Sequence, residues 1–153
     1  MIGRTEEETF TYIGLNVSTT DEGITLDQNQ YIQEKLKPVL LRNGDAKRQL
    51  DNEETQLLRR LVGKINWAAT QTRPDVSFFV VELSTKFKHP QLEDLKKANK
   101  VINKLITSPT KILFPKLKGK IEIITHSDAS FRNLPDQISS GRGHIIFLAD
   151  ENG

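Results

Sequence analysis

Cysteine is absent from this sequence of 153 residues, which excludes disulfides, cysteine-ligated zinc sites and thiol catalysis. Histidine is scarce, with only His89, His126 and His144, so a histidine-rich metal site is not expected. No apolar run approaches the roughly 20 residues that a membrane-spanning helix needs. The first ten residues are acidic and polar, without the basic and then apolar pattern of a secretory signal. These absences indicate a globular protein that neither crosses a membrane nor uses thiol chemistry.

Charge is distributed unevenly along the chain, although the formal net charge is only +2. Residues 1–58 carry 6 basic and 11 acidic residues, a net charge of −5. Residues 59–120 carry 14 basic and 4 acidic residues, a net charge of +10, and residues 121–153 sum to −3. A basic middle between acidic ends favours a polyanionic partner for the middle segment. The alternative is an ordinary lysine-rich helix surface exposed to solvent.

The first third of the sequence predicts a β-hairpin followed by a helix and a loop. Residues 10–17 alternate in polarity as a strand does, residues 21–23 supply a turn, and residues 24–26 supply a short returning strand. Asp27 is placed to cap a helix, and the polar stretch 42–52 indicates a loop. The apolar positions of this helix are Tyr31, Ile32, Leu36 and, at an end that Pro38 disturbs, Val39.

The middle of the sequence predicts three helices. Asp51 or Asn52 can cap the first helix, and Glu54 is placed to complete a capping box. Residues 72–75 interrupt the helical pattern, His89-Pro90 ends the second helix, and Ser108-Pro109 ends the third. The apolar positions are Leu57, Leu58, Leu61, Val62, Ile65 and Ala69 in the first helix, Val76, Phe79, Val80, Leu83 and Phe87 in the second, and Leu95, Ala98, Ile102, Leu105 and Ile106 in the third. The third helix carries Lys96, Lys97, Lys100 and Lys104 outside its apolar face.

After residue 109 the pattern changes to the alternation that is typical of strands. Strands are predicted at residues 111–114, 121–125 and 143–148. A sheet this small does not fold well alone, so we expect these strands to belong to a larger sheet that continues beyond the chain. The fold class predicted from the whole pattern is α+β.

Arg59, Gly63 and Trp67 follow one another at intervals of four residues and therefore share one face of the first long helix. This face lies mostly apart from the apolar face. Glycine permits close approach of a partner to the backbone, an indole can stack or slide in a groove, and arginine can meet phosphate or sugar. The alternative is that Trp67 packs into the helical core as its largest member.

Two of these segments resemble parts of reverse transcriptases. Residues 61–68 (LVGKINWA) resemble the thumb helix of retroviral reverse transcriptases, which carries a nearly identical run. Residues 10–17 (FTYIGLNV) resemble the primer-grip hairpin of the same enzymes and lie at the expected distance upstream.

Two further segments point to one group of these enzymes. Residues 72–78 (TRPDVSF), with Leu83-Ser84, are similar to a signature of copia-type LTR retrotransposon polyproteins. Residues 127–130 (SDAS), with 139–141 (SSG) downstream, resemble the segment that opens their ribonuclease H domain. The chain thus resembles the C-terminal part of a copia-type reverse transcriptase over about residues 10–148.

The resemblance implies a binding role for nine residues. Tyr12, Ile13 and Gly14 would hold the end of the primer, and Arg59, Gly63 and Trp67 would follow the minor groove of an RNA/DNA hybrid or DNA duplex. The complete set of implied nucleic-acid-binding residues is Tyr12, Ile13, Gly14, Arg59, Gly63, Lys64, Asn66, Trp67 and Arg73.

The resemblance also implies a catalytic and metal-binding role for Asp128. It would be the first of four ribonuclease H carboxylates that hold magnesium (Mg²⁺) in the intact enzyme. The other three are absent from this sequence, and so is the adjacent Asp-Asp pair that the polymerase needs. Relatives also carry Asp-Trp where this chain has Ser130-Phe131. We therefore expect this chain alone to be inactive in both reactions.

The domains implied are a primer-grip hairpin at 1–28, a helical thumb or connection unit at 29–108, and the start of an incomplete ribonuclease H-like sheet at 109–153. The implied function is to grip the template–primer duplex in an RNA-directed DNA polymerase, together with the fingers, palm and remaining ribonuclease H segments of the polyprotein. The implied location is intracellular, in a cytoplasmic particle or the nucleus. Two alternatives stay open, a non-catalytic nucleic-acid-binding remnant or domesticated fragment, and a helical protein-interaction module.

Overall fold

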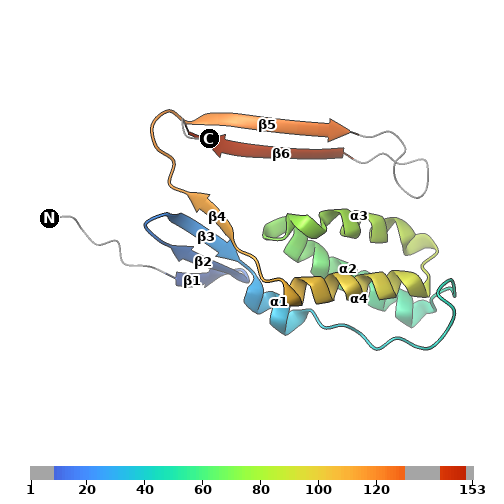
Figure 1. Ribbon diagram of the computed structural model, residues 1–153. Coiled ribbons are helices and arrows are strands. Elements are labelled where there is room, and N and C mark those ends of the chain that lie inside the picture. The colour runs from blue at the N-terminus through green and yellow to red at the C-terminus, as the bar shows by residue number, and fades with distance from the viewer. Residues whose placement is uncertain (1–8, 130–141, 151–153) are drawn as a thin grey trace. The chain divides into compact units, whose positions relative to one another are not determined.

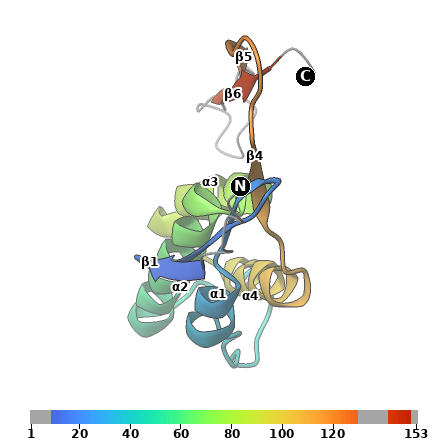
Figure 2. The same ribbon diagram turned by 90° about the vertical axis from the view of Figure 1, so that its left-hand side faces the viewer.

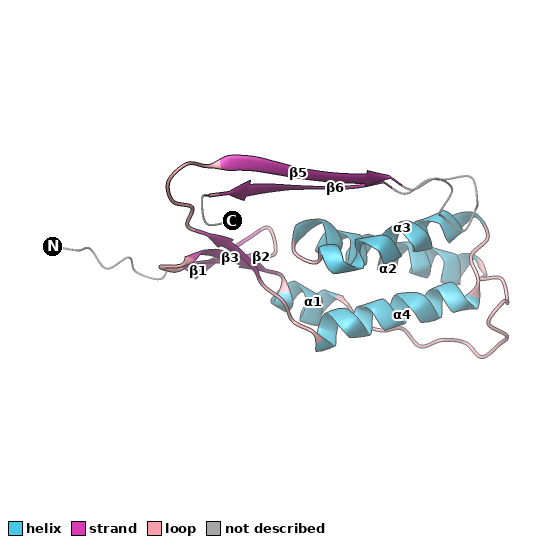
Figure 3. Cartoon of the chain, turned by 45° about the horizontal axis from the view of Figure 1, so that its top comes forward, coloured by secondary structure: helices cyan, strands magenta, loops and turns pink. Residues whose placement is uncertain are grey.

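The computed structural model describes residues 9–129 and 142–150, which form two compact units that divide between Phe114 and Pro115. Helices and two small sheets are present in this part of the chain (Figures 1 and 3), so the predicted α+β class is confirmed. The domain boundaries expected after residues 28 and 108 stay predictions. In chain order the elements are β1 (Thr9–Tyr12), β2 (Leu15–Thr19), β3 (Gly23–Asp27), α1 (Asn29–Lys35), α2 (Asn52–Gln71), the 3₁₀ turn η1 (Pro74–Val76), α3 (Ser77–Thr85), the 3₁₀ turn η2 (Lys86–Lys88), α4 (Leu92–Thr107), β4 (Ile112–Pro115), β5 (Glu122–Ala129) and β6 (Arg142–Ala149).

The first sheet has the strand order β1-β2-β3-β4, with β1, β2 and β3 antiparallel. The prediction of a single strand over residues 10–17 is wrong, because a two-residue turn at Ile13-Gly14 divides it into β1 and β2. Tyr12 pairs with Leu15, and both turn residues have positive φ, 50° at Ile13 and 77° at Gly14. That is the arrangement of a type I′ hairpin turn, which matches the twist of the two strands. The hairpin predicted between residues 17 and 24 is confirmed as β2–β3.

Helix α1 begins beside the end of β3 and is shorter than its apolar pattern predicts. The Asp27 carboxylate accepts a hydrogen bond from the Asn29 amide at 3.0 Å, which satisfies one of the free donors at the start of the helix. The helix ends at Lys35, so Val39 lies outside it. Pro38 explains the early end, because proline lacks an amide donor and disfavours helical backbone in the residue before it.

The hydrophobic core of the first unit lies among α1, α2, α3 and α4 (Figure 2). The break predicted at residues 72–75 is confirmed, with Pro74 opening η1. The second long helix is shorter than predicted, because α3 ends at Thr85 and η2 covers the next three residues. The buried apolar residues of this core are Ile32, Leu36, Leu58, Leu61, Val62, Ile65, Ala68, Ala69, Val76, Val80, Leu83, Leu95, Ala98, Val101, Ile102 and Leu105.

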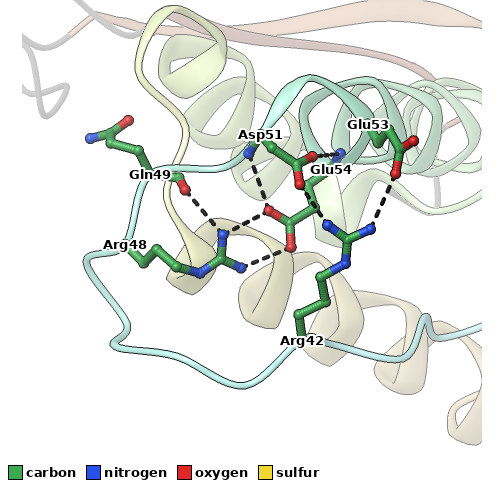
Figure 4. A network of polar contacts seen from close by, with 6 residues as sticks. All are labelled: Arg42, Arg48, Gln49, Asp51, Glu53 and Glu54. Atoms are coloured by element: carbon green, nitrogen blue, oxygen red, sulfur yellow. Dashed lines mark hydrogen bonds and ion pairs between the residues drawn. The ribbon is translucent and has the colours of Figure 1, made fainter.

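The start of α2 is fixed by a network of carboxylates and arginines (Figure 4). The predicted capping box is confirmed, since Asp51 Oδ1 accepts from the Glu54 amide at 2.8 Å and Glu54 Oε2 accepts from the Asp51 amide at 3.1 Å. The Arg48 guanidinium forms a two-pronged pair with the buried Glu54 carboxylate at 2.9 and 2.8 Å. Arg42 reaches Asp51 at 2.6 Å and Glu53 at 3.1 Å. Two arginines of the preceding loop thus tie that loop to the helix.

The second unit consists, in its described residues, of an antiparallel ladder between β5 and β6. Both strands are longer than the predicted 121–125 and 143–148. Exposed apolar side chains lie on both faces, with Ile123 opposite Leu148 on one face and Ile124 opposite Phe147 on the other. A two-stranded ribbon of this kind is marginally stable by itself. None of the helices in the described ranges is long and apolar enough to cross a membrane.

Acid should weaken the loop–helix network through Glu54. The hydrogen bonds from Arg48 lower the pKa of this carboxyl from 4.5 to about 2. Because the pKa is lower in the folded chain than in the unfolded chain, the stabilisation is complete above about pH 4.5 and is lost as the pH falls toward 2. We expect Glu54→Gln to remove this part of the pH dependence, measured by urea unfolding at a series of pH values. Glu53→Gln is the matched control, because Glu53 is largely exposed. An equal loss of pH dependence in both variants would contradict the prediction.

Candidate nucleic-acid interface

The outward face of α2 carries the three residues that the sequence places at intervals of four. Arg59 and Gly63 are exposed and Trp67 is partly exposed, whereas Leu58 and Ile65 are fully buried on the opposite side of the helix. The structure therefore brings these three residues onto one face. After Glu54, α2 contains no acidic residue, so the basic side chains of this helix have no carboxylate on the helix itself beyond its first turn.

Arg59 is held in place by η2, the 3₁₀ turn that follows α3. Its Nη2 donates to the Phe87 carbonyl oxygen at 3.4 Å, and its guanidinium carbon lies 5.7 Å from the centre of the Phe87 ring. No carboxylate is paired with Arg59 among the ion pairs of the described residues. A guanidinium that stacks on an aromatic ring while staying exposed retains donors for an anionic ligand.

Gly63 leaves the middle of this face bare. A Cβ built at this position would meet no heavy atom within 4 Å, so nothing in the structure requires glycine for packing. Glycine inside a helix nevertheless costs roughly 0.5–1 kcal/mol relative to alanine. A costly residue without a packing reason favours a role that depends on the exposed backbone.

Trp67 is not a member of the hydrophobic cluster of the described residues, either as a buried side chain or as one packed against it. The alternative in which this indole is the largest core residue is therefore not supported. Two neighbouring residues of α2, Lys64 and Asn66, are also expected to bind nucleic acid, and their side chains have different surroundings. Lys64 donates from Nζ to the Lys35 carbonyl at 3.1 Å and so leans toward α1, while Asn66 is exposed.

The tip of the β1–β2 hairpin carries the other residues expected to bind nucleic acid. The side chains of Tyr12 and Ile13 are 61% and 64% exposed, and Gly14 has nothing within 4 Å of a Cβ built on it. Ile13 has a positive φ of 50°, which is rare for a β-branched residue and costs free energy. An exposed apolar side chain on strained backbone is not explained by stability of the hairpin itself. Strain of this kind is concentrated at functional sites.

Arg73 lies in the interior, unlike the other residues expected at the interface. Its side chain is 2% exposed, and it forms a two-pronged pair with Asp75 at 2.9 and 3.0 Å. Its Nη1 donates to the carbonyl oxygens of Ser108 at 2.8 Å and Leu105 at 3.4 Å. The guanidinium holds the pKa of Asp75 down to about 2. Since its donors are occupied and buried, Arg73 is a structural residue, and the interface leaves it out.

Asp128 lies on β5 in the second unit, exposed and opposite Gly143. It borders a shallow pocket of about 330 Å³ with His126 and His144. In the described residues no three histidine, aspartate or glutamate side chains gather as a metal site would require. The rest of the predicted ribonuclease H motif, Ser130 with residues 139–141, lies outside the described residues.

Comparison with known proteins identifies relatives of this chain. It is 26% identical over 155 aligned positions to the retrovirus-related Pol polyprotein from transposon RE1 of Arabidopsis thaliana, and 24% identical over 155 positions to that from transposon RE2. Each alignment covers 93% of this chain. The chain is related to retrotransposon Pol polyproteins. The resemblance inferred from the sequence motifs is confirmed at this level.

The relatives are far longer than this chain, which spans about a tenth of the length of the curated Pol polyproteins that it matches. No protein-family model matches the chain, and no solved structure matches it. The roles of individual residues in this Pol-related chain therefore rest on the geometry described above.

Loss of Arg73 should affect stability and leave surface binding intact. Arg73→Met leaves two carbonyl oxygens without their donor and the Asp75 carboxylate with Lys104 alone, and we expect it to lower the free energy of unfolding by about 3 kcal/mol. Arg73→Lys keeps the charge but not the planar guanidinium, so its free energy of unfolding should lie between that of Arg73→Met and that of the unchanged chain. Urea unfolding measures the change. A stable Arg73→Met chain with weakened affinity for nucleic acid would contradict the structural role.

The hairpin tip offers an independent test of strain. Asparagine adopts positive φ more readily than isoleucine, so Ile13→Asn should raise the free energy of unfolding by about 1 kcal/mol. Ile24→Asn is the control, because Ile24 is also exposed but lies in an ordinary strand. Urea unfolding measures the free energy of unfolding of both variants. The prediction would be contradicted if Ile13→Asn lowered it as much as the control does.

Proposed function

We infer that this chain grips a nucleic-acid duplex as part of the reverse transcriptase of a retrotransposon Pol polyprotein. The observation that carries the proposal is the outward face of α2, where an exposed arginine, a bare glycine and a partly exposed indole follow one another at Arg59, Gly63 and Trp67. Arginine can contact phosphate and sugar, and the indole can lie against the sugars of a groove. The relationship to transposon Pol polyproteins supports the same assignment.

The width of a helix favours one kind of duplex. An α-helix with its side chains is about 10–12 Å across, whereas the minor groove of B-form DNA is about 6 Å wide. An A-form duplex has a wide and shallow minor groove lined by sugar hydroxyls. At Gly63 no side chain separates the helix backbone from a ligand, so this point of α2 can approach such a groove closely. An RNA/DNA hybrid of A-like geometry is therefore the proposed ligand of α2.

The tip of the β1–β2 hairpin is the proposed contact for the end of the primer. Tyr12, at the end of β1, and Ile13, in the turn itself, are both largely exposed to solvent. The strained φ of Ile13 fixes the direction of the tip, which preorganises it for a ligand. Within the intact polyprotein, the remaining polymerase segments would complete this site.

Catalysis is not assigned to this chain alone. Asp128 would supply one carboxylate to a magnesium site that other segments of the polyprotein complete, since magnesium is held by carboxylates together with water and phosphate oxygens. The intracellular location expected above, in a particle or the nucleus, belongs to this same proposal.

A second candidate function is nucleic-acid binding without catalysis, as in a remnant of such an element. It requires only residues that this chain itself contains. This candidate uses the same face of α2. The two candidates therefore differ in whether the rest of the polyprotein is needed for function, and agree on binding by the chain itself.

Trp67 is the only tryptophan, so its fluorescence reports on the outward face of α2. Titration of an RNA/DNA hybrid into the full chain should quench this fluorescence, with an affinity that falls steeply as salt rises. A matched B-form DNA duplex should bind more weakly, because its minor groove is too narrow for the helix. An indole whose emission does not respond to either duplex would overturn the proposed function.

Gly63 variants separate binding from stability. Gly63→Ala should raise the free energy of unfolding by roughly 0.5–1 kcal/mol, because helix propensity improves and the Cβ has free space. Gly63→Leu should weaken hybrid binding about tenfold, a loss of about 1.4 kcal/mol, by keeping the duplex away from the backbone. Gln30→Leu, at an exposed position of α1, is the control. If Gly63→Leu bound the hybrid as tightly as the unchanged chain, the close approach proposed here would be wrong.

A further inference from the structure

The connection between α1 and α2 contains an asparagine followed by a glycine, Asn43 and Gly44. Both residues are exposed and lie in a bend outside the helices and strands. In the part of the chain that the structure describes, neither the Asn43 side chain nor the Gly44 amide forms a hydrogen bond. The backbone nitrogen of Gly44 and the side-chain amide that precedes it are therefore both accessible.

This exposed bend lies between two anchors of the loop. Before it, Arg42 Nη1 reaches Asp51 Oδ2 at 2.6 Å, and after it Arg48 pairs with the buried Glu54 carboxylate. Neither contact holds the bend itself. Position 44 has a packing reason to be glycine, because a Cβ built there would lie 2.9 Å from Arg48 Nε. The anchor at Arg48 thus favours, directly after Asn43, the residue that hinders access to its own amide least.

The other asparagines in residues 9–129 and 142–150 are held in helices or strands, and each is followed by a residue with a side chain. They are Asn16, Asn29, Asn52, Asn66, Asn99 and Asn103. The Asn99 side chain, for example, accepts from the Val39 amide at 2.9 Å and donates to the Val39 carbonyl at 2.8 Å. Within these ranges, Asn43 alone combines a bend without hydrogen bonds and a following glycine.

We propose that Asn43 is a site of spontaneous deamidation, which the fold leaves open. The Gly44 backbone nitrogen attacks Asn43 Cγ, the N–Cγ bond forms, and the Cγ–Nδ2 bond breaks. Nδ2 leaves as ammonia and takes the proton that the Gly44 nitrogen gives up. Water then opens the cyclic imide at either carbonyl and yields aspartate or isoaspartate, so that one water is consumed for each ammonia released. The reaction needs no other reactant, because nucleophile and amide are neighbours in one chain.

The products change the loop in two ways. Either product places a new carboxylate directly after Arg42, whose guanidinium already pairs with Asp51 and Glu53. The new carboxylate competes with these two for the same donors. Isoaspartate also lengthens the main chain by one carbon between the anchors at Arg42 and Arg48. Exposed ion pairs contribute little to stability, so the modified chain stays folded and accumulates. This inference does not depend on the function proposed for α2.

The test incubates the full chain at mildly alkaline pH, once folded and once unfolded in guanidinium chloride, and follows deamidation by peptide mapping in acid. The peptide with residue 43 should gain the mass shift of deamidation in the folded chain at a rate within about threefold of the unfolded rate, since a segment without protecting hydrogen bonds opens at little cost. An isoaspartyl methyltransferase should label this peptide. Mapping separates it from the Asn152-Gly153 pair, which lies outside the described residues.

Two controls belong to this test. Asn43→Gln should abolish the signal, because the longer side chain closes its ring far more slowly. Asn66 is the matched internal control, since it is also exposed but lies within α2 and precedes a tryptophan. A folded chain that stays unmodified at residue 43 while the unfolded chain reacts would overturn the inference, because the fold would then protect the pair. Equal rates at Asn66 and Asn43 in the folded chain would overturn it as well.

Discussion

A single buried guanidinium, that of Arg73, sets the geometry on which the helical unit depends. Arg73 lies just after the end of α2. Its guanidinium pairs with Asp75 in η1 and donates to the carbonyl oxygens of Leu105 and Ser108 where α4 ends. Burial of an arginine is unfavourable unless its donors are paired, so the three segments must meet in one arrangement for the charge to be tolerated. This meeting of α2, η1 and α4 at Arg73 sets the direction in which the outward face of α2 points. The Thr-Arg-Pro-Asp motif, from which a binding role for Arg73 was inferred, is thus part of the scaffold that orients the proposed interface.

The long connection between α1 and α2 depends on a similar use of polar groups. Sixteen residues without a helix are uncommon inside a compact unit, and such loops are usually mobile or functional. Here the Asn99 side chain of α4 accepts from the Val39 amide at 2.9 Å and donates to the Val39 carbonyl at 2.8 Å, while Arg48 clamps Glu54 at the start of α2. A chain without cysteine has no disulfides for this purpose. Buried or partly buried hydrogen bonds between distant segments replace them, and they make the loop part of the folded unit.

Local patterns were sufficient to predict the helices, because periodicity and capping act within a few residues. The Asp51–Glu54 capping box and the break at Pro74 are of this kind. The Ile13-Gly14 turn escaped prediction because a two-residue turn keeps the alternation of polarity in step across it, and isoleucine is not a residue that favours positive φ. The burial of Arg73 escaped prediction for a different reason. Asp75 is close in the sequence, but the two carbonyl partners at Leu105 and Ser108 lie more than thirty residues away, and the spacing of residues does not predict that distant contact.

The net charge of the middle segment illustrates how far composition can support a function. Counted along the sequence, residues 59–120 are simply basic, with a sum of +10. In the folded unit this charge is divided by what each side chain contacts. Arg73 is buried in the scaffold, and the charges of Lys97 and Lys104 are paired with neighbouring carboxylates. What remains is spread over the exposed basic side chains of α2, α4, η2 and the segment 111–120. Charge alone therefore does not single out one surface. The bare glycine and the partly exposed indole distinguish the outward face of α2, because they allow close contact with the shape of a groove.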